Sequence, residues 1–146
     1  MKKIGITGQE GFVGKHLYNT LGLYPEEFEP IPFERRFFES EEKLDAFVSQ
    51  CDVIVHLAAM NRHDSEQVIY DTNVALANQL VDSLKRTASK AHVLISSSTQ
   101  EERDNLYGKS KREGREALVN WAKQSEGKIS GLIIPNVFGA FGKPFY

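Results

Sequence analysis

The stretch TGQEGFVG, residues 7–14, follows directly on the apolar run KKIGI near the start of the chain. Gly8, Gly11 and Gly14 stand at intervals of three within it, and each glycine costs backbone entropy. An apolar pattern typical of a helix begins at Gly11, so the glycines connect a strand to the first turn of a helix. A strand, a glycine-rich turn and a helix in this order are typical of a site where a pyrophosphate approaches the backbone. The alternative is a glycine-rich turn that binds nothing.

The composition is that of an ordinary globular domain, with 146 residues, 40% hydrophobic side chains and a net charge of -2. Lys and Arg are scattered, which argues against a nucleic-acid-binding surface, and no apolar run approaches the roughly 20 residues of a membrane span. Cys51 is the single cysteine and excludes an internal disulfide; because the N-terminus also lacks signal-peptide features, we expect a cytoplasmic protein. The four histidines show no zinc-ligand spacing, so we expect no metal site.

Apolar runs alternate with helical patterns along the chain, starting and ending on a strand. Buried strands that alternate with helices indicate an α/β fold with a parallel sheet covered on both faces, and right-handed crossovers make the sheet doubly wound. In such a sheet the ligand lies at the carboxyl ends of the strands. The expected strands are Lys2–Thr7, Phe28–Phe33, Asp52–Ala59, His92–Ser97 and Ile129–Pro135, and the expected helices are Gly11–Leu23, Ser40–Gln50, Ser65–Lys85 and Leu106–Gln124.

The segment YGKSK places Tyr107 and Lys111 four residues apart on the last expected helix, so both lie on one helix face. An ammonium group beside a phenol lowers the pKa of the phenol, and such a tyrosine acts as an acid or base near neutral pH. The same spacing also arises by chance in a chain with several tyrosines and many lysines.

The segment ISSSTQ brings Ser96, Ser97 and Ser98 to the end of a buried strand. Hydroxyl groups there would lie at the same edge of the sheet as the glycine turn, where they could hydrogen-bond the carbonyl oxygen of a substrate. The alternative for each serine is a polar exit from the strand into a loop.

Together and in this order, TGQEGFVG, HLAA at 56–59, SSS at 96–98, YGKSK at 107–111 and PNVFG at 135–139 resemble the extended short-chain dehydrogenases/reductases. These enzymes form the NAD-dependent epimerase/dehydratase family. The resemblance extends over nearly the whole chain. It implies that residues 1–146 form an NAD(P)-binding Rossmann domain, the truncated N-terminal fragment of a longer enzyme.

The resemblance also implies a catalytic set of Ser98, Tyr107 and Lys111, with Ser97 as the alternative to Ser98. Asn73, which the helical pattern points inward, matches an asparagine that the family uses as a structural residue or a proton relay. The implied cofactor contacts are Gly8, Gly11, Phe12, Val13, Gly14, Leu57, Ala58, Ala59, Asn73 and Pro135, with Glu34, Arg35 and Arg36 near the adenosine ribose.

Two features depart from the common pattern of the family. The segment between the second and third expected strands is too short for the usual extra strand and helix, so we expect five strands in the order 2-1-3-4-5. The stretch between Ser98 and Tyr107 is also short, so we expect substrate geometry to differ from that of the common epimerases.

The choice between NAD and NADP depends on the segment PFERR after the second strand. Glu34 lies 20 residues beyond Gly14, where an acid would bind the ribose 2′-hydroxyl of NAD. Arg35 and Arg36 could instead hold a 2′-phosphate with bidentate geometry. We favour NADPH because two arginines follow each other, with NAD as the alternative.

Both departures, together with HLAAMNR, SSSTQ and IIPNVFGAFGKP, resemble a narrower group of enzymes, those that make UDP-N-acetyl-L-fucosamine precursors for capsular and O-antigen polysaccharides. This resemblance implies NADPH-dependent reduction of a UDP-4-keto-6-deoxy-N-acetylhexosamine, a cupin domain after the reductase domain, and a homodimer when full length. Two alternatives stay open. One is an NAD-dependent nucleotide-sugar epimerase or dehydratase, and the other is a non-catalytic dinucleotide-binding module, a class that usually lacks the Tyr–Lys pair.

Overall fold

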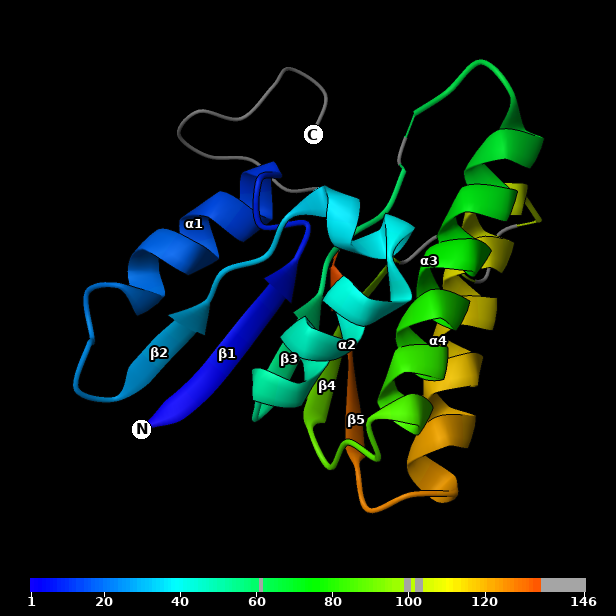
Figure 1. Cartoon of the computed structure of the whole chain (residues 1–146). Coiled ribbons are helices and arrows are strands. Elements are labelled where there is room, and N and C mark those ends of the chain that lie inside the picture. The colour runs from blue at the N-terminus through cyan, green and yellow to red at the C-terminus, as the bar shows by residue number, and fades with distance from the viewer. Residues whose placement is uncertain (61, 99–100, 102–103, 135–146) are drawn as a thin grey trace.

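The computed structural model describes residues 1–60, 62–98, 101 and 104–134. These residues form a five-stranded sheet in the order β2-β1-β3-β4-β5, and every neighbouring pair of strands is parallel (Figure 1). The strand order expected from the sequence is therefore confirmed. The strands are β1 (Lys2–Thr7), β2 (Phe28–Ile31), β3 (Val53–His56), β4 (His92–Ser98) and β5 (Lys128–Ile134), and the helices are α1 (Phe12–Leu21), the 3-10 helix η1 (Arg35–Glu39), α2 (Glu41–Gln50), α3 (Glu66–Arg86) and α4 (Leu106–Lys123).

The helices cover the sheet from both sides because the chain leaves β1 toward one edge and returns to build toward the other. Helix α1 packs on one face over Ile4, Ile6 and Val55. Helices α2, α3 and α4 pack on the opposite face, where the larger core includes Ile54, Val93, Leu80, Leu118 and Trp121. The direction of winding thus reverses between β1 and β3, and a doubly wound sheet binds ligands at the carboxyl ends of the strands near such a reversal.

The second strand ends earlier than the apolar run predicted. It stops at Ile31, and the backbone N–H of Phe33 donates to Oε1 of Gln9, at 3.2 Å, instead of extending the ladder with β1. The chain then turns into η1, which the sequence did not predict. The ring of Phe33 contacts three other aromatic rings, with centroid distances of 5.0 Å to Phe47 and 5.5 Å to both Phe37 and Phe38. Burial of this aromatic cluster is the reason that the segment leaves the sheet.

The third strand is also shorter than expected, because its regular ladder ends at His56 rather than at Ala59. The N–H of Leu57 still bonds to the carbonyl oxygen of Thr7, at 3.1 Å. Beyond this bond the chain leaves the sheet as a loop, in which Leu57, Ala58 and Ala59 are each partly buried.

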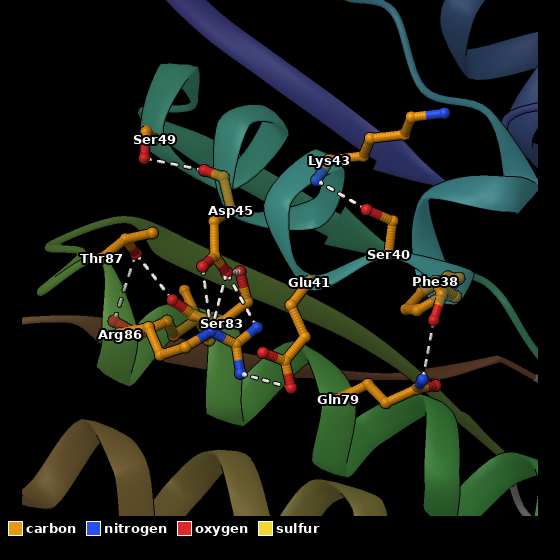
Figure 2. Close-up of polar contacts among 11 residues, drawn as sticks. Phe38, Ser40, Glu41, Lys43, Asp45, Ser49, Gln79, Ser83, Arg86 and Thr87 are labelled. Atoms are coloured by element: carbon orange, nitrogen blue, oxygen red, sulfur yellow. Dashed lines mark hydrogen bonds and ion pairs between the residues drawn. The ribbon is translucent and has the colours of Figure 1, made fainter.

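Polar contacts fix η1 and α2 against α3 (Figure 2). The guanidinium of Arg86 donates to the Asp45 carboxylate from Nε, at 2.9 Å, and from Nη2, at 2.9 Å, and the hydroxyl of Ser83 donates to the same carboxylate at 2.6 Å. Gln79 Nε2 donates to the carbonyl oxygen of Phe38, at 2.8 Å. These bonds hold η1 in place, and with it the two arginines at its start. No helix in the part of the chain that the structure describes is long and apolar enough to cross a membrane.

Candidate active site

The turn between β1 and α1 lies at the carboxyl edge of the sheet (Figure 1). Gly8 has a φ of +76°, and a Cβ there would lie 2.9 Å from the backbone nitrogen of Ala58. A Cβ on Gly14 would lie 2.1 Å from the carbonyl oxygen of Gly8, which is far inside van der Waals contact. The N–H of Gly11 donates to that same oxygen, at 2.9 Å. Side chains are excluded here because backbone packs directly on backbone, as a turn that cradles a phosphate requires.

Helix α1 differs from the other α-helices at its N-terminus. Side chains cap α2, α3 and α4: Ser40 accepts from Lys43, Ser65 from Val68, and Asn105 from Gly108. At α1 the N-cap is Gly11, no side chain caps the helix, and the first turn holds no acidic residue. The first N–H groups of a helix and its dipole form an anion site when no side chain competes for them. Phe12 and Val13, at this first turn, were expected as cofactor contacts.

A buried bond between two strands supports the base of the turn. The hydroxyl of Thr7 is hydrogen-bonded to Nδ1 of His56, at 2.7 Å, and its oxygen accepts from the N–H groups of Leu57, at 3.1 Å, and Ala58, at 3.2 Å. Burial, and secondly the charge of Lys111, lower the pKa of His56 to about 3, so the imidazole is neutral at physiological pH. The bond therefore ties β1 to the HLAA segment, which was expected to contact the cofactor.

Helix α4 brings Lys111 to the same edge of the sheet. Its Nζ donates to the carbonyl oxygen of Ser96 in β4, at 3.4 Å, and the hydroxyl of Ser96 donates to the carbonyl oxygen of His56, at 3.4 Å. A chain of hydrogen bonds thus runs from Lys111 on α4 through Ser96 on β4 and His56 on β3 to Thr7, which directly precedes the glycine turn. Burial lowers the pKa of Lys111 to about 8, and the charge of Glu101 opposes this shift.

Tyr107 occupies the first turn of α4, one helical turn before Lys111. The lowered phenol pKa that the sequence predicted is not found. Burial raises the pKa of the Tyr107 phenol above its ordinary value, in the direction opposite to that predicted. The physical reason is that removal of the phenol from water disfavours the phenolate. The tyrosine is therefore set to remain protonated near neutral pH.

Asn73 lies on α3 and is buried, as the inward pattern predicted. Its amide binds the backbone of Met60 twice: Oδ1 accepts from the N–H, at 2.7 Å, and Nδ2 donates to the carbonyl oxygen, at 3.0 Å. Nδ2 also lies 3.3 Å from the Ser110 hydroxyl, which in turn donates to the carbonyl oxygen of Tyr107 at 2.7 Å. Asn73 thus fixes the loop after β3 against the helix that carries Tyr107 and Lys111.

The serines at the end of β4 differ in their surroundings. Ser97 is 4% exposed, and its hydroxyl has no hydrogen-bond partner among the described residues. Ser98 ends the strand and pairs in register with Ile134 of β5. Its side chain, together with Thr99 and with Pro135, lies outside the described part of the chain, so the catalytic assignment of Ser98 and the cofactor contact of Pro135 stay predictions.

The residues expected near the ribose follow β2. Glu34 is the N-cap of η1, and its carboxylate forms an ion pair with the guanidinium of Arg36 at the surface. Arg35 begins η1 and is exposed. Glu34 and Arg36 were predicted as alternative contacts of the adenosine ribose, but in the structure they form an ion pair with each other. The carboxylate thus orients Arg36 and reduces its local charge, while Arg35 has no ion pair among the residues that the structure describes.

Sequence reasoning missed the roles of Thr7, His56 and Glu101. Thr7 stands directly before the first glycine and His56 opens HLAA, so their places at two strand ends that adjoin in the 2-1-3 order could have indicated the contact. Glu101 is 9% exposed, and its carboxylate accepts from Arg115 Nε, at 3.0 Å, and Nη2, at 2.9 Å. No motif in the sequence marks that pair.

Comparison with known proteins agrees with this arrangement. Residues 4–146 match the family described as the NAD dependent epimerase/dehydratase family. The chain belongs to this family. The NAD dependent epimerase/dehydratase match covers every described element except the first residues of β1.

A curated relative, UDP-2-acetamido-2,6-beta-L-arabino-hexul-4-ose reductase from Pseudomonas aeruginosa, is 32% identical over 99% of this chain and 38% of its own length. The crystal structure of the capsular polysaccharide assembling protein CapF from Staphylococcus aureus is also 32% identical, with a TM-score of 0.78 over 99% of this chain and 37% of that one. The chain therefore spans less than two fifths of either relative.

A more distant likeness is to RMD from Pseudomonas aeruginosa, solved as a complex with NADPH. It is 20% identical, with a TM-score of 0.87 over 100% of this chain and 58% of that one. At this identity the likeness is one of fold alone, and it confirms the Rossmann-like arrangement of sheet and helices.

Proposed function

We propose that this chain is the cofactor-binding part of a cytoplasmic enzyme that reduces a UDP-linked 4-keto-6-deoxy-N-acetylhexosamine with NADPH, in the synthesis of capsule or O-antigen sugars. The observation that carries the proposal is the meeting of an uncapped glycine turn with the Tyr107–Lys111 pair at one edge of the sheet. The substrate class is supported by the relative that is named as a UDP-hexulose reductase and by the likeness to CapF. We further propose that the longer protein is a homodimer.

The residues of the turn fit a dinucleotide. Gly8 and Gly14 leave no room for side chains, and the N-terminus of α1 offers backbone donors without a competing cap. These groups would hold the pyrophosphate, with the HLAA segment and Asn73 beside it. Arg35 would hold a 2′-phosphate of NADPH, because Arg36 is already paired with Glu34. The structure of RMD with NADPH supports this choice of cofactor for the fold.

When bound, NADPH supplies the hydride for the carbonyl carbon of the sugar. The protein has to supply a proton to the oxygen that becomes an alkoxide. Tyr107 is suited to this because burial raises the pKa of its phenol, so the group carries its proton near neutral pH. Lys111 provides a cation one helical turn away, and Ser98 would hydrogen-bond the carbonyl oxygen.

The reaction is tested with the full-length protein, NADPH and a UDP-4-keto-6-deoxy-N-acetylhexosamine. We expect NADP+ to form in an amount equal to the sugar reduced. A sugar converted to its epimer without net NADP+ would replace the proposal by the epimerase alternative. Cofactor binding without any conversion of nucleotide sugars would favour the non-catalytic dinucleotide-binding module.

Cofactor choice is tested separately by titration with NADPH and NADH, followed by the fluorescence of the reduced nicotinamide. Tighter binding of NADPH is expected if an arginine at the start of η1 meets the 2′-phosphate. Tighter binding of NADH would move the ribose contact to Glu34.

A further inference from the structure

Glu101 directly follows the ISSSTQ segment, in the short stretch between Ser98 and Tyr107. It is nearly buried, and its carboxylate receives two N–H bonds from Arg115, at 3.0 Å from Nε and 2.9 Å from Nη2. Arg112 Nη1 donates to the backbone carbonyl oxygen of Glu101, at 3.3 Å. Two arginines of α4 therefore hold one residue of the stretch by both its side chain and its backbone.

These contacts place Glu101 beside the catalytic face of α4. Tyr107, Lys111 and Arg115 follow one another at intervals of four, so their side chains lie along one face of the helix. Arg115 is the next residue along this face after Lys111. A carboxylate that is bound to Arg115 therefore lies close to the amine of Lys111, and the charge of Glu101 acts on that amine.

Among the described residues, few groups around Lys111 could balance its charge. The carbonyl oxygen of Ser96 in β4 accepts from Nζ, and His56 of β3 is neutral. Asn73, from α3, is also uncharged. Arg112 and Arg115 on α4 itself add positive charge, and Glu101 is the acidic group whose charge favours the ammonium form.

We infer that Glu101 is a positioning residue for the reduction: bound by Arg115 and Arg112 of α4, it keeps a negative charge beside the Lys111 ammonium and braces the helix that carries Tyr107. The role of Glu101 in turnover rests on the proposed function, whereas its effect on the charge of Lys111 does not.

Removal of the charge on Glu101 and removal of the charge on Arg115 should shift the pKa of Lys111 in opposite directions. Glu101→Gln removes the negative charge and leaves two arginines, so the pKa of Lys111 falls further below about 8, by roughly 0.5 to 1 pH unit. Arg115→Gln removes a cation and keeps the carboxylate, which Arg112 still holds by its backbone, so the pKa of Lys111 rises. A merely structural pair would shift this pKa in the same direction, or not at all, in both variants.

The pKa is measured by competitive labelling of amines with acetic anhydride across a pH series, followed by mass spectrometry of the peptide that contains Lys111. Glu113→Gln is the matched control, because Glu113 is a carboxylate on the same helix whose partners are Tyr70 and Lys109. We expect the control to leave the Lys111 titration unchanged. An unchanged or raised pKa in Glu101→Gln overturns the inference, and if that variant does not fold, a lowered pKa in Arg115→Gln overturns it.

Activity gives the second readout. In the full-length protein we expect Glu101→Gln to lower kcat roughly tenfold or more, through misplacement of Tyr107, while the Kd for NADPH changes little. The loss should deepen at alkaline pH, and Glu101→Asp should restore part of it. Wild-type kcat and an unchanged pH profile in Glu101→Gln contradict the inference. Absence of reduction by the wild-type protein would contradict the proposed function instead, and the labelling experiment would still decide the role of Glu101.

Discussion

Of the helices that begin at the carboxyl edge of the sheet, α1 and α4 begin in opposite ways. Helix α1 starts with glycine, without a side-chain cap and without an acid in its first turn. Helix α4 starts with the Asn105 cap, and its first turns are bound to other elements by Ser110, Arg112 and Arg115. The first helix keeps its backbone donors open, and the second uses its side chains to hold one geometry.

Under the proposed function, this difference assigns cofactor binding to α1 and the chemical step to α4. A phosphate can be held by backbone groups, so the sequence before α1 only has to leave space. A proton donor and a cation must be side chains, and their positions matter to fractions of an ångström, so α4 is bound from several sides. Substitutions should therefore act on affinity at α1 and on turnover at α4.

Tyr107→Phe gives the largest effect and tests the α4 half of this comparison. Loss of the proton donor should lower kcat for sugar reduction roughly 1000-fold, because general acid catalysis by a positioned side chain contributes on that order. The Kd for NADPH should stay close to the wild-type value, since in the proposed function backbone groups at α1, not Tyr107, hold the cofactor. Both constants are measured on the full-length protein, by NADPH consumption and by fluorescence titration, and a kcat near wild type would remove Tyr107 from the mechanism.

Gly14→Ala tests the α1 half. A Cβ at this position would lie 2.1 Å from the Gly8 carbonyl oxygen, so the turn or the helix has to move. We expect the affinity for NADPH to fall roughly 100-fold, which is about 2.7 kcal/mol, together with a lower Tm. Gly22→Ala is the control, because a Cβ there comes no closer than 3.4 Å to its neighbours and lies at the other end of α1. Equal losses in the two variants would refute the steric argument.

Lys111→Met separates stability from turnover at α4. The pKa of Lys111 lies near 8, below its ordinary 10.5, so below pH 8 the fold holds a buried charge that the unfolded chain solvates freely. The wild-type protein should therefore gain stability as the pH rises from 8 to 10.5. At pH 7 the methionine variant should be more stable by about 2 kcal/mol but nearly inactive. Urea unfolding at pH 7 and at pH 10 checks the sign, and a destabilised variant at pH 7 would contradict it.

Arg35→Ala sharpens the comparison at the ribose end of the α1 site. Loss of a guanidinium that meets a 2′-phosphate should weaken NADPH binding about tenfold, or about 1.4 kcal/mol, and leave NADH binding unchanged. Arg36→Ala should act less, because Glu34 already pairs with that side chain. Titration of each variant with both cofactors measures the ratio. The reverse order of the two effects would assign the phosphate to Arg36.

The sheet order and the glycine turn could be predicted from the sequence because both depend on local patterns. Apolar runs mark buried strands, and only glycine satisfies the contacts at Gly8 and Gly14. The helical spacing of Tyr107 and Lys111 was equally local. The direction of the pKa shift at Tyr107 was not, because it depends on how deeply the phenol is buried after α4 packs against α3 and β4.

Other features escaped because they join distant residues without a periodic signal. Helix η1 replaces the end of the second strand because Phe33 packs on Phe47, which belongs to another helix. The pair of Glu101 with Arg115 combines residue types that are common on any surface. Burial alone distinguishes it, and burial follows only from the assembled fold.

The bond between Thr7 and His56 also bears on the order in which the molecule is completed. Thr7 and its partners at His56, Leu57 and Ala58 are 49 to 51 positions apart in the chain. A nascent chain that emerges from the ribosome up to the end of α2 already has all three glycines, but it lacks the strand on which the Gly8 turn rests. The nucleotide pocket is thus a late product of synthesis. A cofactor can stabilise the finished domain, but it cannot serve as a template for its first half.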